Sequence, residues 1–158
     1  MVAMAAHDIT VDLPPGWDGE IYQRPGEGFT PSLRPGGAGI VNPVMHLANF
    51  ALPVPRGDFG GGAVELMGKG AVFISLFEHE RAAAGTPLFA SEGVPWPLRP
   101  DDFDPNRMQR PLPGQSGAQW FFSSAGRAFC LYVVLGSHAR RAVLVREANR
   151  ALATVALA

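Results

Sequence analysis

Cysteine is almost absent from this sequence: Cys130 is the only one in 158 residues. A single cysteine cannot form a disulfide within the chain, and it excludes a zinc site built on two or four cysteines of one chain. Cys130 lies in the apolar stretch 128–135, where no neighbouring base or helix start would lower the pKa of its thiol. We therefore predict an unreactive thiol in the core.

Charged residues and long apolar runs are also scarce. Charged residues make up 17% of the chain and the formal net charge is -1, so the positive charge that non-specific nucleic-acid binding requires is missing. No apolar run approaches the roughly 20 residues of a membrane-spanning helix. The first residues lack the basic segment of an export signal, so we expect a cytoplasmic protein unless such a signal has been removed. We predict neither a nucleic-acid partner nor a membrane span.

Apolar and aromatic residues are abundant instead. Hydrophobic residues make up 47% of the chain, with 10 Phe and 3 Trp, which is enough to offset the entropy of folding. A chain of this length typically forms one domain around one core. We therefore expect residues 1–158 to form a single globular domain.

Apolar patterns predict several β-strands. The first predicted strand alternates apolar and polar residues, which is the period of a half-buried strand. The third, fourth and last are apolar on both faces, which is typical of strands inside a sheet. The last two are joined by a turn at 124–126 and form a hairpin. The predicted strands are residues 7–13, 17–23, 44–52, 71–78, 119–123 and 127–135.

Two segments have helical features. Residues 58–68 fit one short helix that begins near Asp58 and ends at glycine. The tail from Arg140 repeats apolar residues at helical spacing, which predicts a C-terminal amphipathic helix that packs on the sheet.

Residues 24–43 are rich in Gly and Pro and are expected to form a loop. The predicted fold class is therefore α+β, around a mainly antiparallel sheet.

Residues 85–117 contain seven of the 15 prolines, which excludes long helices and central strands. The segment also holds many apolar residues, so we expect a long ordered loop that packs onto the body and has a functional role. Trp96 stands between Pro95 and Pro97, which present its ring at low conformational cost, facing either inward or outward. We predict an interaction surface that includes Trp96, Leu98 and Phe103.

The stretch Glu78-His79-Glu80 at the end of a predicted strand has two interpretations. It is either a metal or acid–base site, to which His46 could contribute, or polar residues where a strand reaches water. In a strand the two carboxylates point one way, about 6.6 Å apart, and the imidazole points the other way. Zinc needs at least three protein ligands, and hard divalent ions need more oxygen ligands than this. We therefore favour the strand end.

No other motif predicts a reaction. The glycines between 60 and 70 do not fit a phosphate-binding loop, because their spacing is wrong and Lys69 is followed by Gly70 rather than by Ser or Thr. The four histidines are isolated from one another in the sequence. We predict no catalytic residue, no cofactor and no metal ligand.

Three features resemble the PsbP-like fold, that of the extrinsic photosystem protein and its bacterial relatives. They are an opening strand that ends in LPPGW (13–17), a hairpin with GRAF (126–129), and a terminal amphipathic helix. The resemblance covers most of the chain in the order of elements, and the Pro-rich insertion at 85–117 departs from it. It implies a non-catalytic protein, such as an assembly factor, a binding protein or a chaperone.

Two hypotheses for the function follow. The first is a non-enzymatic interaction, accessory or chaperone-type domain that binds another protein, or a second copy of itself, through an apolar surface near residues 85–117. The alternative is an enzyme or small-ligand-binding protein with a pocket between that loop and the sheet, using His46, Glu78 and His79. A concave pocket with ionisable groups would favour the alternative, and a flat apolar patch would favour the first.

Overall fold

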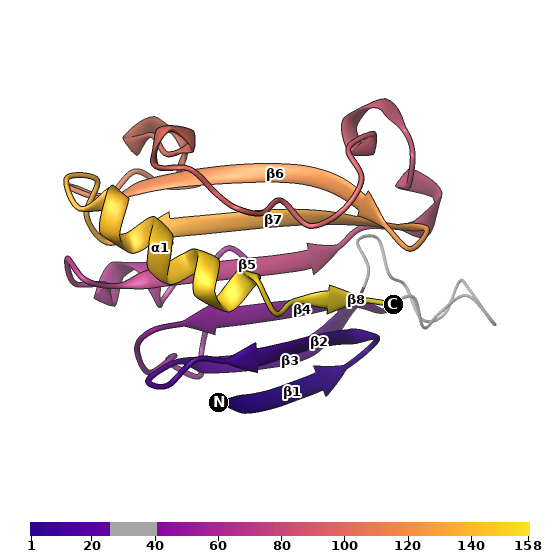
Figure 1. Cartoon of the computed structure of the whole chain (residues 1–158), viewed down its shortest axis with the longest axis horizontal. Helices are drawn as coiled ribbons and strands as arrows, with labels where there is room; N and C mark the ends of the chain where they lie inside the picture. Colours follow the sequence, from indigo (N-terminus) through magenta and orange to yellow (C-terminus); the bar gives the residue numbers. More distant parts are fainter. Residues whose placement is uncertain (26–40) are drawn as a thin grey trace.

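The chain folds into two antiparallel sheets that lie against each other (Figure 1). The computed structural model describes residues 1–25 and 41–158. The large sheet has five strands in the order β3-β4-β5-β7-β6, and the small sheet has three in the order β1-β2-β8. The strands are β1 (Val2–Ala6), β2 (Ile9–Leu13), β3 (Asp18–Pro25), β4 (Val41–Ala48), β5 (Val72–Glu78), β6 (Ser116–Ser124), β7 (Arg127–Leu135) and β8 (Ala156–Leu157).

One long helix, α1 (Arg141–Leu152), lies beside the small sheet, and both cover the same face of the large sheet (Figure 1). We call this the inner face and the opposite one the outer face. The apolar side of α1 is buried through residues such as Leu144, Ala148 and Leu152. They join Ile74 and Leu131 of the large sheet in one core cluster. The predicted α+β class, antiparallel sheet and C-terminal amphipathic helix are confirmed.

Both faces of β5 and β7 are buried, as their continuous apolar sequences predict. On the outer face, Phe73, Tyr132 and Val134 are covered by a second cluster that contains Val64 and Met108. The covering residues come mainly from the connection between β4 and β5, residues 49–71, and from the Pro-rich loop.

The structure differs from the sequence-based expectations at three short elements. Strands β1 and β8 were not predicted. The predicted helix at 58–68 is only a 3-10 turn, η1 (Val64–Leu66). Gly60 and Gly62 have φ values of +85° and +95°, so the backbone before η1 leaves the helical region. A Cβ on Gly60 would lie 2.5 Å from the ring of Phe73, so this loop packs too closely on the sheet for another residue.

The Pro-rich loop is ordered, as predicted. It contains the 3-10 turns η3 (Pro87–Phe89), η4 (Pro100–Asp102) and η5 (Pro105–Arg107), and a further turn, η2 (Arg81–Ala83), precedes it. Glu92 and Asp104 form single bridges to Ser123 and Gly117, so the loop follows the edge of β6. The loop predicted at 24–43 lies mostly outside the described residues, and strands β3 and β4 include its two ends.

Arg127 connects the two sheets. Its side chain is 2% exposed, and it donates two hydrogen bonds to Glu78, from Nη2 to Oε1 (2.8 Å) and from Nε to Oε2 (3.1 Å). Nη1 donates to the main-chain oxygens of Asp8 (3.2 Å) and Ala158 (3.0 Å), and Nη2 donates to that of His7 (3.1 Å). All five N–H groups of the guanidinium are therefore hydrogen-bonded. A buried charge is tolerated when it is paired in this way.

The β1–β2 turn depends on the same guanidinium. His7 and Asp8 have φ values of 52° and 61°, which residues other than glycine adopt rarely and at a cost. Their carbonyl oxygens face Arg127, and the oxygen of Asp8 also accepts from the main-chain N of Ala158 (3.0 Å). Arg127 thus stabilises the strained turn and the chain after β8 together.

The first prediction concerns this ion pair. Glu78→Gln removes the negative charge while keeping one acceptor, so the free energy of unfolding should fall by about 3 kcal/mol in denaturant titrations. The matched control is Glu147→Gln, because the Glu147–Arg150 pair is exposed and should contribute less than about 1 kcal/mol. Equal losses in the two variants would contradict the central role of Arg127.

Candidate functional site: a pocket on the outer face

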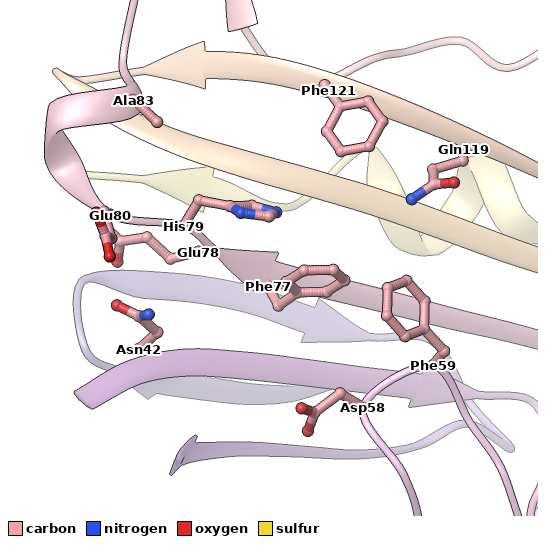
Figure 2. Close-up of a pocket in the computed structure, with 10 residues that line it drawn as sticks. All are labelled: Asn42, Asp58, Phe59, Phe77, Glu78, His79, Glu80, Ala83, Gln119 and Phe121. Atoms are coloured by element: carbon pink, nitrogen blue, oxygen red, sulfur yellow. The ribbon is translucent and has the colours of Figure 1, made fainter. Parts of the chain in front are cut away.

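A pocket of about 460 Å³ opens on the outer face, where β5 ends (Figure 2). Most of its lining comes from three places: strand β5 and the residues after it, strand β6, and the segment before η1. The lining residues are Asn42, Asp58, Phe59, Phe77, Glu78, His79, Glu80, Ala83, Gln119 and Phe121. The alternative hypothesis predicts a pocket between the Pro-rich loop and the sheet. The pocket on the outer face differs, because none of its lining residues belongs to 85–117.

The hollow follows from the register of the strands. Phe77 of β5 and Phe121 of β6 both pair with Cys130 of β7, so the three residues lie in one row across the sheet. The small side chain of Cys130 stands between two large rings and leaves space above it. Gln119 partly covers the thiol, with Nε2 at 3.1 Å from Sγ. Burial raises the pKa of the Cys130 thiol to about 11, which accords with the predicted core thiol.

Aromatic rings line the hollow. The rings of Phe59 and Phe77 meet edge to face with centroids 4.9 Å apart, and His79 stacks obliquely on Phe77 at 5.1 Å. His79 also lies 6.2 Å from Phe121, across the space between the two strands. Figure 2 shows the His79 ring pointing into the space that Phe121, Phe77 and Phe59 surround. Phe59 and Phe121 are only half-buried, so their rings are accessible to a ligand.

His46 positions the wall of the pocket that contains Asp58 and Phe59. It is fully buried on β4; its Nδ1 accepts from Arg56 Nε (3.0 Å), and its Nε2 lies 3.0 Å from the main-chain oxygen of Asp58. The hydrogen-bond pattern assigns the ring proton to Nε2. Ser75 donates to the same oxygen (2.6 Å), and Tyr22 donates to Asp58 Oδ1 (2.8 Å).

A neutral imidazole is required at this position. Burial is the main reason why the pKa of His46 falls from 6.5 to about 4, and the neighbouring positive charge of Arg56 lowers it further. The hydrogen bond to Asp58 opposes the shift but does not cancel it. A second proton on the ring would place an N–H group against the N–H of Arg56.

The structure does not combine the three residues of the predicted alternative site: Glu78 and His79 both border the pocket, but His46 does not. The carboxylate of Glu78 binds Arg127, His46 lies beneath residues 53–58, and only His79 turns its ring into the pocket. In the part of the chain that the structure describes, no group of three or more His, Cys, Asp or Glu residues could hold a metal ion. Sequence reasoning missed Phe59, Gln119 and Phe121, although the alternation along 119–121 placed two of them on one face.

Of the three predicted interaction residues, only Trp96 is at the surface. The residue is 54% exposed, and its Nε1 donates to the main-chain oxygen of Asn149 on α1 (3.0 Å). Leu98 and Phe103 are each 4% exposed and belong to the inner core. The side chain of Asn149 binds both main-chain groups of Leu98, which holds the loop on the helix.

Comparisons of the chain with models of protein families, with curated proteins and with solved structures found no match. The resemblance to the PsbP-like fold therefore stays a prediction. Among residues 1–25 and 41–158, no helix is long and apolar enough to cross a membrane.

The second prediction follows from His46. The unfolded chain takes up a proton near pH 6.5, whereas the folded chain resists it until about pH 4, so the stability that neutral His46 provides is complete above pH 6.5 and is lost as the pH falls toward 4. Between pH 7 and pH 5 the wild type should lose about 2 kcal/mol more than His46→Gln, which keeps an acceptor and a donor but cannot be protonated.

Unfolding titrations at several pH values measure this difference. His7→Asn is the control, because His7 is exposed in the β1–β2 turn and its side chain can be replaced by one that tolerates a positive φ. This variant should follow the wild type. Parallel pH curves for the wild type and His46→Gln would show that His46 is not a buried neutral base.

Proposed function

We propose that this protein is a non-catalytic binding protein that holds a small, largely apolar molecule in the outer-face pocket. The observation that carries the proposal is the pair of partly buried rings, Phe59 and Phe121, that border a hollow of about 460 Å³. Pockets of this size, lined by aromatic residues with a few polar groups, typically hold small ligands. Asn42 and Gln119 provide polar groups in the lining that can orient such a ligand.

The bonding of the reactive residues supports binding rather than catalysis. His46 uses both ring nitrogens in hydrogen bonds within the fold, and Glu78 uses both oxygens on Arg127. Cys130 is buried with a raised pKa, so little thiolate exists near neutral pH. A catalytic nucleophile or base needs reach to the substrate and a suitable pKa. The non-catalytic roles that the PsbP-like resemblance implies agree with this proposal.

The third prediction tests the pocket with a neutral aromatic probe, 2-naphthalenemethanol, by NMR titration of the labelled protein. Phe121→Ala removes one wall and Ala83→Trp fills the hollow. Each should weaken binding at least fivefold, because loss of about 40 Å² of apolar contact at about 25 cal/mol per Å² costs about 1 kcal/mol.

The control for the pocket variants is Phe50→Ala, which alters a half-buried ring of the outer-face cluster outside the pocket lining. It should bind the probe like the wild type. The proposal fails if the wild type does not bind the probe at millimolar concentration, or if folded Phe121→Ala and Ala83→Trp both bind it like the wild type.

A second candidate function, binding of another protein or of a second copy of the chain, is favoured by Trp96. The residue is 54% exposed, although its indole N–H donates to a main-chain oxygen of α1. Tryptophan is among the residues most enriched in binding hot spots. The other two residues of the predicted surface are buried, so this candidate is restricted to Trp96 and its immediate surroundings.

The fourth prediction tests whether Trp96 only anchors the Pro-rich loop to α1 or also binds a partner. Trp96→Ala should lower the free energy of unfolding by only about 1 to 2 kcal/mol, because the residue is already 54% exposed and one hydrogen bond is lost. Association should be lost, as measured by sedimentation and by affinity capture from cell extract. Leu88→Ala, which changes an exposed residue of the same loop, is the control. Unchanged association in folded Trp96→Ala would exclude this role.

A further inference from the structure

We propose that the surface formed by α1 and the small sheet binds a second copy of the chain about a two-fold axis, with the basic side of each copy over the acidic side of the other. This inference rests on the second candidate function, names its partner, and does not depend on the outer-face pocket. Three features of this surface support it: exposed apolar side chains, short side chains on the small sheet, and charges of opposite sign that lie apart.

The outward side of α1 combines apolar and basic side chains. Residues three or four apart share one side of a helix, so Val143, Arg146 and Arg150 lie together, opposite the buried side. Val143 is 52% exposed. Trp96, which is 54% exposed, lies against the same helix through its hydrogen bond to Asn149. Covering these apolar groups with another protein surface is favourable.

The small sheet continues this surface with short side chains. Figure 1 shows it beside α1, on the same face of the large sheet. Thr10 and Asp12 of β2 point outward, because alternate residues of a strand lie on the same side. Their neighbours across the sheet are the exposed alanines Ala3, Ala5 and Ala156. These short side chains allow α1 of a second copy to approach the sheet closely.

Positive and negative charges lie at different places on this surface. Residues 140–152 contain four arginines and one glutamate: Arg140, Arg141, Arg146, Arg150 and Glu147. The small sheet carries Asp12, and its β1–β2 turn carries Asp8. Asp12 lies at the C-terminal end of α1, because its main-chain N and O bind Thr154 Oγ1 at 3.0 and 3.1 Å. A two-fold axis between the basic and acidic sides brings unlike charges together twice.

The charges near Trp96 do not reverse this separation. The turn η4, which contacts α1, contributes Asp101 and Asp102. Arg99 precedes this turn, and Arg107 donates to the main-chain oxygen of Asp102 (3.1 Å). Two acidic and two basic side chains largely offset one another here. The arginines of α1 and the aspartates of the small sheet therefore set the charge of the surface.

Arg146 and Asp12 are the residues that we expect to meet across the axis. Both are exposed, Arg146 on the outward side of α1 and Asp12 on the middle strand of the small sheet. Arg150 pairs instead with Glu147 of its own helix, with Nη1 3.3 Å from Oε1. In a two-fold dimer each contact occurs twice, so one substitution changes two contacts.

Charge reversal tests the proposal by analytical sedimentation at submillimolar protein concentration. The wild type should be a dimer that dissociates as salt is added, because salt screens the charge pairs. Arg146→Glu and Asp12→Arg should each raise the dissociation constant of the dimer about tenfold or more, since each variant opposes like charges at two places. Arg110→Glu is the control, because it makes the same change of charge at an exposed residue beside η1. It should leave the dimer unchanged.

Combining the two reversals should restore the dimer. A mixture of the Arg146→Glu and Asp12→Arg proteins should form a one-to-one heterodimer, because each contact again joins an acid and a base. The double variant, with both changes in one chain, should form a homodimer for the same reason. Recovery in either experiment also shows that the single variants are folded.

Three results would overturn the proposal: a wild type that stays monomeric, a dimer that both reversals leave intact, or a lost dimer that neither the mixture nor the double variant recovers. These results do not decide the second candidate function, which is tested separately by Trp96→Ala. If that variant loses association while the charge reversals do not, Trp96 binds a partner but not through the two-fold arrangement proposed here.

Discussion

The buried pair of Arg127 and Glu78 joins the two sheets, and much of the structure depends on it. A guanidinium in the core is costly unless every N–H group finds an acceptor. Here Glu78 and three main-chain oxygens accept all five. Those oxygens belong to the β1–β2 turn and to Ala158, so one side chain holds the small sheet against the end of β5. His79 and Glu80, which line the pocket, come directly after Glu78 in the chain, so the ion pair fixes the point at which this part of the lining begins.

The outer face is organised by a second buried polar group, the neutral imidazole of His46. It holds Arg56 and Asp58, and through them the segment that provides one wall of the pocket. The floor depends on a difference in size, since Cys130 stands between Phe77 and Phe121 in one row of the sheet. The hollow therefore results from the packing of residues that belong to the sheet and its core. Its aromatic and acidic lining residues are accessible to a ligand.

The residues with reactive chemistry mostly serve the structure. Glu78, His46 and Cys130 are the types from which catalytic sites are built, yet each is buried and bonded within the fold. Chemical type alone therefore does not identify function in this chain. Accessibility distinguishes the groups, because a ligand can reach the partly buried rings of Phe59 and Phe121 and the exposed residue Glu80.

The sequence by itself determined strands β2 to β7 and the C-terminal helix, because period-2 and helical apolar patterns are local properties of the chain. Tertiary structure alone decided the partners of Glu78 and His46, the outward position of Trp96 and the burial of Leu98 and Phe103. It also decided that residues 58–68 contain only a short 3-10 turn. Strand β8 was decided in the same way, because a strand of two residues is too short to show an alternating apolar pattern. Each of these depends on contacts between residues far apart in the chain, which no local pattern records.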